Sequence, residues 1–292
     1  MTRLLAVVLL VAVTGCGGSE DASPERARWL LPRVCDPGGV PCIDAVVTEM
    51  TARFEPLAAT CDHRAPFALM YLRVTEAVGR EERSGSLRAD RVYLSRLDAV
   101  FARLYFDASD AWAAGRREAI PAAWQIAFEA AKRRRVSGIG DLLLGMNAHI
   151  SRDLPFAVAS IGLGPRNETA RARAFAKINE VLARVQAAIL REASTRFDPS
   201  IAGFRLPVLE VDAATVGLLI GTWRDGALQD GRRLLRAKTP AARAAVTRTI
   251  EDNAAGRAAI IVAATSRVPF SDAGKARDRS CKSAARQPAG SA

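Results

Sequence analysis

The chain has 292 residues, of which 49% are hydrophobic and 6% aromatic, and its formal net charge at pH 7 is +11. This length and apolar content allow one large domain or two modest ones, and the few aromatic residues argue against a β-sandwich and favour packed helices. The positive charge would ordinarily suggest nucleic acid or an anionic membrane as a partner. The basic residues are scattered, however, and the one run, Lys132–Arg135, has no aromatic residues interleaved with it. We therefore expect no nucleic-acid partner and interpret the run as a solvated helix end.

The N-terminus has the pattern of a secretion signal. Arg3 precedes an apolar run from Leu4 to Val13, which is too short to span a bilayer but suits the core of a signal peptide. The next residues, Thr14-Gly15-Cys16, complete a sequence that resembles the lipobox at which bacterial lipoproteins are cleaved and lipidated. The alternatives are an uncleaved anchor or a buried N-terminal strand. On the lipobox interpretation, residues 1–15 are the signal peptide and a lipid on Cys16 anchors the protein to the cell membrane on its extracytoplasmic side. Residues 16–41 would then form a flexible leader that ends in a Pro/Gly loop.

Four other cysteines remain for disulfides in that oxidising compartment. They are Cys35, Cys42, Cys61 and Cys281, and they lack the paired CxxC spacing of a structural zinc site. Three connectivities are possible, and we prefer Cys35 with Cys42 and Cys61 with Cys281.

Apolar residues recur at three- and four-residue steps through most of the chain, which is typical of amphipathic helices. No convincing strand, no internal repeat and no dividing linker is visible, so we expect a single all-α, orthogonal or bundle-like domain over residues 42–265, without a sheet. A polar loop is expected over residues 79–88. We expect the polar tail, residues 266–292, to be disordered unless Cys281 holds it. The expected helices cover residues 43–60, 63–78, a long segment through Phe101 and Trp112, 121–131, 138–155, 175–197, 213–237 and 240–265.

The central stretch, residues 138–155, carries polar side chains within an apolar helix. His149 and Asp153 are four residues apart, so they lie on one face of the helix, and Asn147 lies on the other side of the buried stripe. Pro155 cannot donate a helical hydrogen bond, so the helix should kink or end just past Asp153. The predicted buried stripe consists of Leu143, Met146, Ile150 and Leu154.

A metal site is one interpretation of these residues. His149 and Asp153 can share one divalent ion, and Asp62 and His63 could complete its ligand set, because His63 falls on the apolar side of its own helix. The His-x-x-x-Asp spacing is similar to a ligand spacing in the all-helical zinc-dependent phospholipase C family. With only two histidines in the chain, a trinuclear zinc cluster of that kind is excluded, and only a one-metal site, with a zinc-like divalent ion, or a carboxylate-rich site remains.

Two other interpretations need no metal. In the first, Asp153 fixes the tautomer of His149, whose free nitrogen then takes a proton from water or a substrate, with Asn147 as a further catalytic candidate. In the second, the buried histidine is structural and satisfies its nitrogens through a carboxylate and a backbone group, while Asp62 caps a helix. Signatures of serine-hydrolase elbows, phosphate loops and dinucleotide sites are absent from the sequence.

Two segments, residues 61–76 and 140–155, resemble those of an uncharacterised bacterial family, the domain-of-unknown-function family numbered 5995. The likeness extends from roughly Cys42 to Thr265. Its most specific part is the Asn-Ala-His-Ile motif that begins at Asn147, and Ser151 stands where the family has Asn. The resemblance implies a helical domain with the same polar cluster, and it implies no activity.

The sequence thus predicts an exported, lipid-anchored helical protein with a pocket formed by Asp62, His63, Asn147, His149 and Asp153. If the protein is an enzyme, the expected reaction is metal-assisted hydrolysis of a phosphoester or another envelope ester. The alternative is a non-enzymatic envelope protein that binds a ligand or partner and whose His/Asp cluster is structural.

Overall fold

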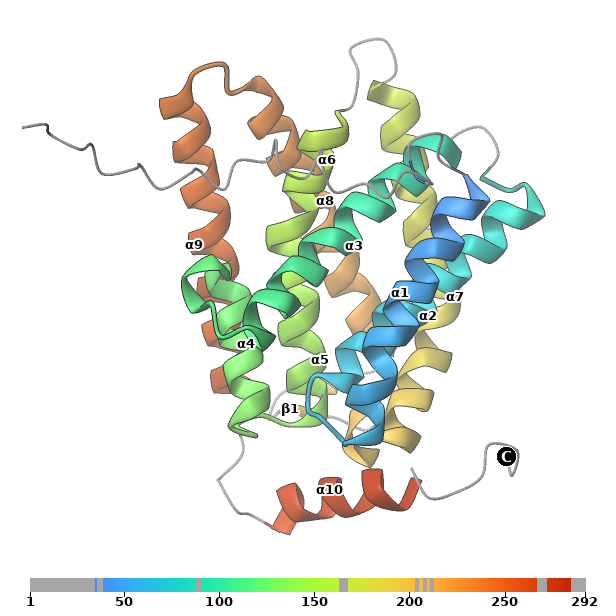
Figure 1. The fold of residues 1–292 in the computed structure, drawn as a ribbon, viewed down its shortest axis with the longest axis vertical. Helices are drawn as coiled ribbons and strands as arrows, with labels where there is room; N and C mark the ends of the chain where they lie inside the picture. Colours follow the sequence, from blue (N-terminus) through green and yellow to red (C-terminus); the bar gives the residue numbers. More distant parts are fainter. Residues whose placement is uncertain are drawn as a thin grey trace, which may run out of the picture.

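The computed structural model describes residues 35, 39–87, 91–162, 168–202, 205–206, 209–210, 213–266 and 272–284. The expected signal peptide, Cys16 and most of the leader lie outside these residues. The all-α fold class is confirmed (Figure 1). The helices are α1 (Val40–Ala59), α2 (Ala65–Ser84), α3 (Arg91–Ala113), α4 (Ala122–Lys132), α5 (Gly138–Asn147), α6 (Leu154–Ile161), α7 (Glu168–Arg196), α8 (Ala213–Arg236), α9 (Pro240–Thr265) and α10 (Asp272–Ala284). Short 3-10 turns occur at Arg117–Ala119 and Pro199–Ile201, and β1 (Arg205–Leu206) pairs antiparallel with β2 (Leu209–Glu210).

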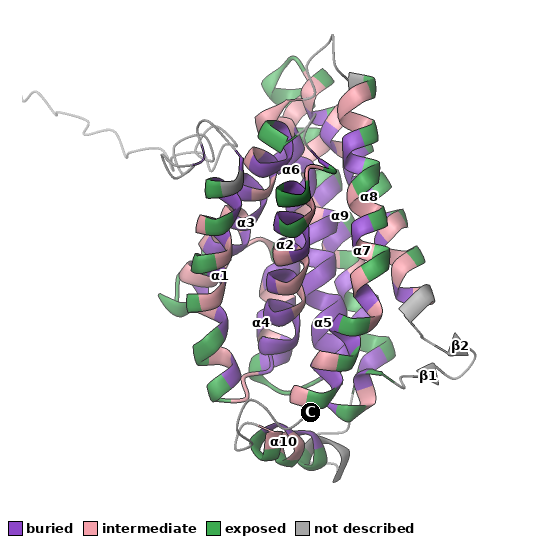
Figure 2. Ribbon diagram, turned by 90° about the vertical axis from the view of Figure 1, so that its right-hand side faces the viewer, coloured by how far each residue is buried: buried purple, intermediate pink, exposed green. Residues whose placement is uncertain are grey.

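Helix α5 lies at the centre of the bundle, and all of its residues are buried. It packs against α2, α4 and α9, while α6, which continues it, packs against α3 and α8. Figure 2 shows α4 and α5 as the buried interior and the exposed residues on the outer sides of α1, α7 and α8. The sequence predicted one buried stripe on this segment. The helix is instead enclosed on every side, and its polar residues Asp141 and Asn147 each have one hydrogen-bonded group within the core.

Helix α2 continues through the first half of the stretch that we expected to be a polar loop. It ends at Ser84, and Gly85 follows in the left-handed conformation that favours glycine, with φ of 84°. Gly79 lies within α2, where that helix packs closely against α1. A Cβ atom at this position would lie only 3.1 Å from the Ile43 side chain of α1. Its missing side chain therefore serves the contact between two helices and does not interrupt the chain.

Both preferred disulfides are present. Cys35 is bonded to Cys42, and Cys61 is bonded to Cys281 on α10. Helix α10 lies across one end of the bundle (Figure 1), so the prediction of a disordered tail does not hold for residues 272–284. We expected disorder only if Cys281 did not hold the tail, and the Cys61–Cys281 disulfide holds these residues.

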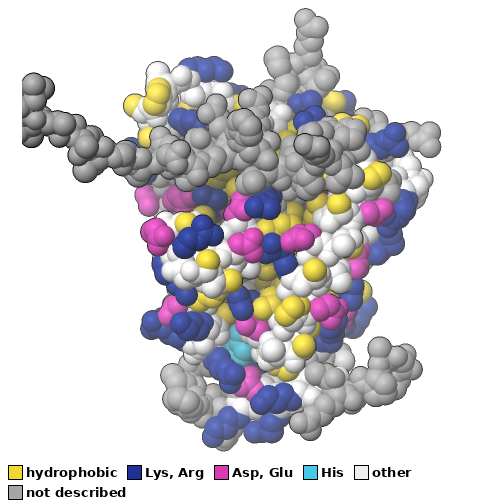
Figure 3. All heavy atoms as spheres, in the orientation of Figure 1, with side chains coloured by type: hydrophobic (Ala, Val, Ile, Leu, Met, Phe, Trp, Pro, Cys, Tyr) yellow, Lys and Arg dark blue, Asp and Glu magenta, His cyan; other side chains and the backbone are white. Residues whose placement is uncertain are grey.

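Charged side chains are distributed over the surface. Figure 3 shows Lys and Arg side chains interspersed with Asp and Glu across one face. Within the basic run, Arg134 forms an ion pair with Asp278 of α10, so part of the run fastens the C-terminal helix to the bundle. Among the described helices, none is long and apolar enough to cross a membrane.

Candidate functional site

A wide turn of π-helix joins α5 to α6. It spans Ala148–Asp153, and the backbone N–H of Leu154 donates to the carbonyl oxygen of His149, five residues back. Pro155, the next residue, has no N–H to donate, and the chain absorbs the missing bond by widening the turn before it. The sequence predicted a kink or an end here. The structure instead keeps the helix nearly continuous and places both His149 and Asp153 in the widened turn.

Asp153 is fully buried and accepts hydrogen bonds from three side chains. Trp124 Nε1 donates to its Oδ2 at 2.8 Å, and Arg152 Nη1 donates to its Oδ1 at 3.0 Å. His149 Nδ1 lies 3.2 Å from Oδ2. A buried carboxylate needs such donors to compensate for its lost hydration. Burial alone would lower the pKa of Arg152, but the carboxylates of Asp153 and Glu251 outweigh this effect and raise it above its ordinary value.

The contact with Asp153 determines which nitrogen of His149 carries the proton. Because a carboxylate only accepts hydrogen bonds, Nδ1 carries the proton in the neutral ring and Nε2 is left as an acceptor. Burial lowers the pKa of His149, and the hydrogen bond to Asp153 offsets this only in part. The ring is therefore neutral at pH 7. It stacks on Phe101, with ring centroids 3.5 Å apart and planes 9° from parallel.

Nε2 of His149 is buried and has no hydrogen-bond partner among the described residues. The hydroxyl of Tyr71, whose ring centroid lies 4.2 Å from that of His149, is likewise buried without a partner. Leaving a buried polar atom unpaired costs about 1–3 kcal/mol. Two such atoms on adjacent rings therefore indicate a place where a ligand or water can supply the missing bonds.

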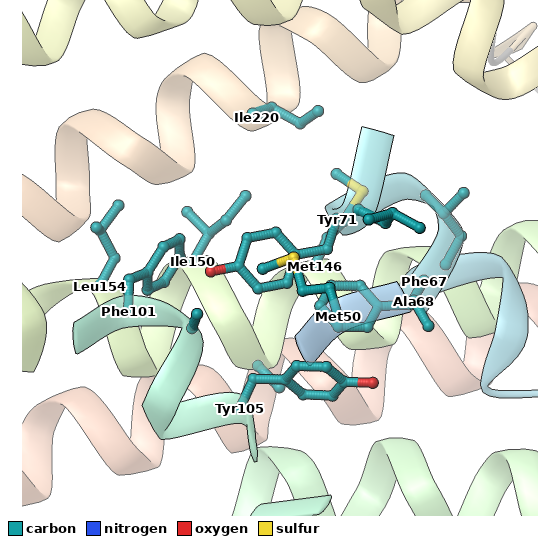
Figure 4. Close-up of a cluster of buried hydrophobic side chains, with 14 of the residues drawn as sticks. Met50, Phe67, Ala68, Tyr71, Phe101, Tyr105, Met146, Ile150, Leu154 and Ile220 are labelled. Atoms are coloured by element: carbon teal, nitrogen blue, oxygen red, sulfur yellow. The ribbon is translucent and has the colours of Figure 1, made fainter. Parts of the chain in front are cut away.

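Both rings line a pocket between α2, α7, α8 and the central segment. Its empty volume is about 630 Å³, including the open space at its mouth. Figure 4 shows the apolar cluster that forms its inner wall, with Phe67, Tyr71 and Phe101 around Met146 and Ile150 and with Ile220 facing them from α8. Apart from His149, Gln186, Arg224 and the Tyr71 hydroxyl, the side chains that line the pocket are apolar. Small-molecule sites in proteins have this mainly apolar composition with a few polar groups.

Arg224 brings a positive charge to the same pocket from α8 and is only 6% exposed. Its Nε donates to Asn179 Oδ1 at 2.6 Å, and its Nη2 donates to the Phe175 carbonyl oxygen at 3.4 Å. No carboxylate of the described residues forms an ion pair with it. Burial accordingly lowers the pKa of Arg224 to about 10, although the guanidinium stays charged at pH 7.

The other predicted site residues lie elsewhere. Asn147 is fully buried, but its Nδ2 donates to the Ala254 carbonyl oxygen of α9 at 2.8 Å. His63 contacts the α10 end of the bundle, where Nε2 lies 3.2 Å from Asp278 Oδ1 and Nδ1 lies 3.0 Å from Arg277 Nη1. Asn147 Oδ1 is buried without a partner among the described residues, so a catalytic role for Asn147 stays a prediction, as it does for His149 and Asp153.

Asp62 has a local structural role. Its Oδ1 accepts a hydrogen bond from the backbone N–H of Arg64 at 2.8 Å, just before α2 begins, and its carboxylate pairs with the Arg64 guanidinium. Although burial favours the neutral acid, the hydrogen bonds from Arg64 hold the pKa of Asp62 below its usual range. The prediction that Asp62 caps the helix is wrong, because the N-cap of α2 is Arg64 and no side chain caps it; Asp62 instead stabilises the turn just before the helix.

The four predicted metal ligands, Asp62, His63, His149 and Asp153, are not gathered around one point. His149 and Asp153 contact each other, and Asp62 and His63 have the separate partners described above. In the part of the chain that the structure describes, no three His, Cys, Asp or Glu side chains are grouped so that they could hold a metal ion.

Sequence reasoning missed the partners of Asp153 and the pocket cation. Neither Trp124 nor Arg152 was predicted to contact Asp153. Arg224 had a detectable signal, because it falls at four-residue spacing in the row Val216, Ile220, Arg224, Leu228, in which every residue is buried. A charged residue in the middle of an otherwise apolar helical row is a site candidate in its own right.

Comparison with known families agrees with this geometry. A family model described as a family of unknown function, DUF5995, matches residues 43–264. The chain belongs to the DUF5995 family. The match covers α2 to α8 and almost all of α1 and α9, and so contains the pocket and the widened turn, whereas α10 lies outside it. Neither a curated protein nor a solved structure matches the chain.

Proposed function

We propose that this DUF5995 protein is an exported, lipid-anchored protein that binds a small, mainly apolar molecule in the pocket beside His149. The observation that carries the proposal is the unpartnered Nε2 of His149, held as an acceptor by Asp153, in a mostly apolar cavity. The ligand therefore carries a hydroxyl or N–H group that donates to Nε2. A purely hydrocarbon ligand would fill the cavity but would leave this nitrogen unpaired.

The proposed hydrogen bond is tested with two isomers. Decan-1-ol and 1-methoxynonane have the same atoms and similar apolar bodies, but only the alcohol can donate. The protein is prepared as the full chain with Cys16→Ser, which prevents lipidation and makes detergent unnecessary. Calorimetry is expected to give the alcohol about 5- to 10-fold tighter binding, corresponding to one net hydrogen bond of about 1 kcal/mol.

Two variants assign that preference to the pocket. His149→Phe keeps a flat ring on Phe101 and should bind both isomers equally. His63→Gln alters the other buried histidine, which does not line this pocket, and should retain the wild-type preference. Equal binding of the two isomers by the wild type, or an unchanged preference in His149→Phe, would count against the proposal.

General-base catalysis is a second candidate, and the orientation of His149 by Asp153 favours it. Nε2 would accept a proton from a water molecule whose oxygen attacks an ester carbonyl, and the imidazolium would return that proton to the departing alkoxide. Because the predicted metal ligands do not converge, this candidate uses no metal. Turnover of 4-nitrophenyl decanoate that disappears in His149→Phe and persists in His63→Gln would support it, and equal rates in both variants would refute it.

The lipid anchor is tested separately. On the proposed localisation, Cys16→Ser should move the protein from the membrane fraction to the soluble fraction and abolish labelling by a radioactive fatty acid. Retention of the variant in membranes would remove the anchor from the proposal without affecting the pocket.

A further inference from the structure

Among the described residues that line the pocket, only Arg224 is charged at pH 7, since His149 is neutral there. An isolated buried cation is costly, because the apolar surroundings replace its hydration poorly. The two hydrogen bonds of Arg224 go to an amide oxygen and a backbone carbonyl, both uncharged. The charge of Asp225 only partly offsets the cost of burial, and among the described residues no carboxylate forms an ion pair with Arg224.

A purely structural role explains only part of this arrangement. The bonds to Asn179 and Phe175 connect α8 to α7, and the guanidinium carbon lies 4.2 Å from the centre of the Phe175 ring. These contacts use Nε, Nη2 and one face of the guanidinium. Nη1 has no hydrogen bond to the described residues, and the side chain lines the cavity. The Nη1 edge of the guanidinium is therefore not used in the contacts between α7 and α8, and it can donate hydrogen bonds to an anion.

From this geometry we infer that the donor-bearing ligand proposed above is also an amphipathic carboxylate, with its anionic group on Arg224, its hydroxyl or N–H group on His149 Nε2 and its hydrocarbon body against the apolar wall. The inference rests on the proposed function, since it names the ligand class of the same pocket. A carboxylate matches the fork of a guanidinium and is a monoanion. A phosphate dianion would need a second cation, and no other Lys or Arg lines the pocket. The wall that would contact the hydrocarbon is formed by Met70, Val74, Leu182, Ile189, Val216 and Ile220.

A carboxylate bound to Arg224 should also change the pKa of His149. The positive charge of Arg224 contributes to lowering the pKa of that histidine, so the two groups share one electrostatic environment. When a carboxylate neutralises Arg224, this effect is removed and protonation of His149 becomes easier. A bound carboxylate should therefore raise the pKa of His149, which nuclear magnetic resonance of the His149 ring protons can follow.

The test compares ligands that differ in head-group charge. Decanoate, decan-1-ol and decylammonium are titrated into the full chain with Cys16→Ser near neutral pH, below their aggregation concentrations. Decanoate is expected to bind about 10- to 100-fold more tightly than the alcohol, as for a hydrogen bond to a charged group, and decylammonium more weakly than either. This series needs no pocket variant, so it stays decisive even if a substitution at Arg224 prevents folding.

Two arginine variants locate the effect. Arg224→Met keeps an unbranched, flexible side chain and removes the charge, and it should reduce the preference for decanoate over the alcohol to about 1. Arg257→Met is the matched control. Arg257 lies over the ring of Trp223, the neighbour of Arg224, but does not line the pocket, so its loss should leave the preference intact.

The outcomes separate the inference from the proposed function. If the wild type distinguishes decan-1-ol from its ether isomer but binds decanoate no better than the alcohol, the carboxylate inference fails and the proposed function stands. If decanoate binds tightly but the isomers bind equally, the hydrogen bond to His149 fails and the anion site stands. Binding of decylammonium as tight as that of decanoate, or an unchanged preference in Arg224→Met, would overturn the inference. If none of the ligands binds, both proposals fail together.

Discussion

Replacing Asp153 with alanine tests whether the polar cluster supports the fold as strongly as its geometry implies. The substitution removes the acceptor for Trp124 Nε1, His149 Nδ1 and Arg152 Nη1. Arg152 keeps its bond to Glu251 at 2.8 Å, so the main losses fall on the tryptophan and histidine N–H groups. Each buried, unpaired donor costs about 1–3 kcal/mol, and removing one partner of a buried polar pair costs about 3–5 kcal/mol.

We therefore expect Asp153→Ala to lower the free energy of unfolding by about 3–5 kcal/mol. For a chain of this size, each kcal/mol corresponds to roughly 2–4 °C in melting temperature, so the midpoint should fall by roughly 6–20 °C. Urea unfolding followed by far-ultraviolet circular dichroism measures the first quantity, and thermal unfolding measures the second. Asp153→Asn should be milder, because the amide oxygen can still accept from Trp124.

The control is Asp110→Ala, which removes a carboxylate that pairs with Arg53 but is 47% exposed in its side chain. Exposed pairs contribute at most about 1 kcal/mol. If Asp153→Ala changes the unfolding free energy no more than Asp110→Ala does, the three hydrogen bonds do not carry the stability assigned to them.

The other predictions concern the pKa of His149 and two helical glycines, one on α5 and one on α9. The pKa of His149 is lowered in the folded protein, so the unfolded chain binds more protons as pH falls below its ordinary value. The free energy of unfolding should therefore decrease from about pH 7.5 to about pH 5, and the decrease should be smaller in His149→Phe. Urea unfolding of the two proteins at a series of pH values measures this. The prediction is wrong if the free energy of unfolding changes with pH equally in both proteins. Gly145→Ala would place a Cβ atom 2.3 Å from Phe67 Cγ, and we expect a loss of about 1–3 kcal/mol in the same unfolding assay. Gly256→Ala on α9 meets no atom within 4 Å and should instead add about 0.5–1 kcal/mol, and a loss there similar to that of Gly145→Ala would contradict the steric explanation.

The parts of the site that the sequence predicted are those set by local geometry. His149 and Asp153 meet because residues four apart share a helix face, and Pro155 perturbs the helix because it lacks an N–H. Both effects operate within one turn of chain. They survive the widened turn, which changes the hydrogen-bond spacing but keeps the two side chains 3.2 Å apart.

The parts that it did not predict depend on contacts between distant segments. Asp62 and His63 are adjacent in sequence, and helical periodicity shows that His63 faces inward without showing which helix it meets. One partner, Asp141, lies on α5, and two others, Arg277 and Asp278, lie more than 200 positions away on α10. They reach His63 because the disulfide between Cys61 and Cys281 holds that helix across the end of the bundle. The prediction that Asp62, His63, His149 and Asp153 surround one metal ion was wrong, because the sequence does not show which helix His63 contacts.

The arrangement of unpaired atoms bears on whether the His149 cluster is only structural. A structural interpretation accounts for Asp153, whose three donors satisfy it, and for Nδ1 of His149. It does not account for Nε2 of His149 or the hydroxyl of Tyr71, which are buried without partners beside the cavity. Nor does it account for Arg224, with which no carboxylate of the described residues forms an ion pair. A core selected for stability alone would pair such groups or replace them with apolar ones. Their position around one cavity instead fits a protein that completes its hydrogen bonds when a ligand enters.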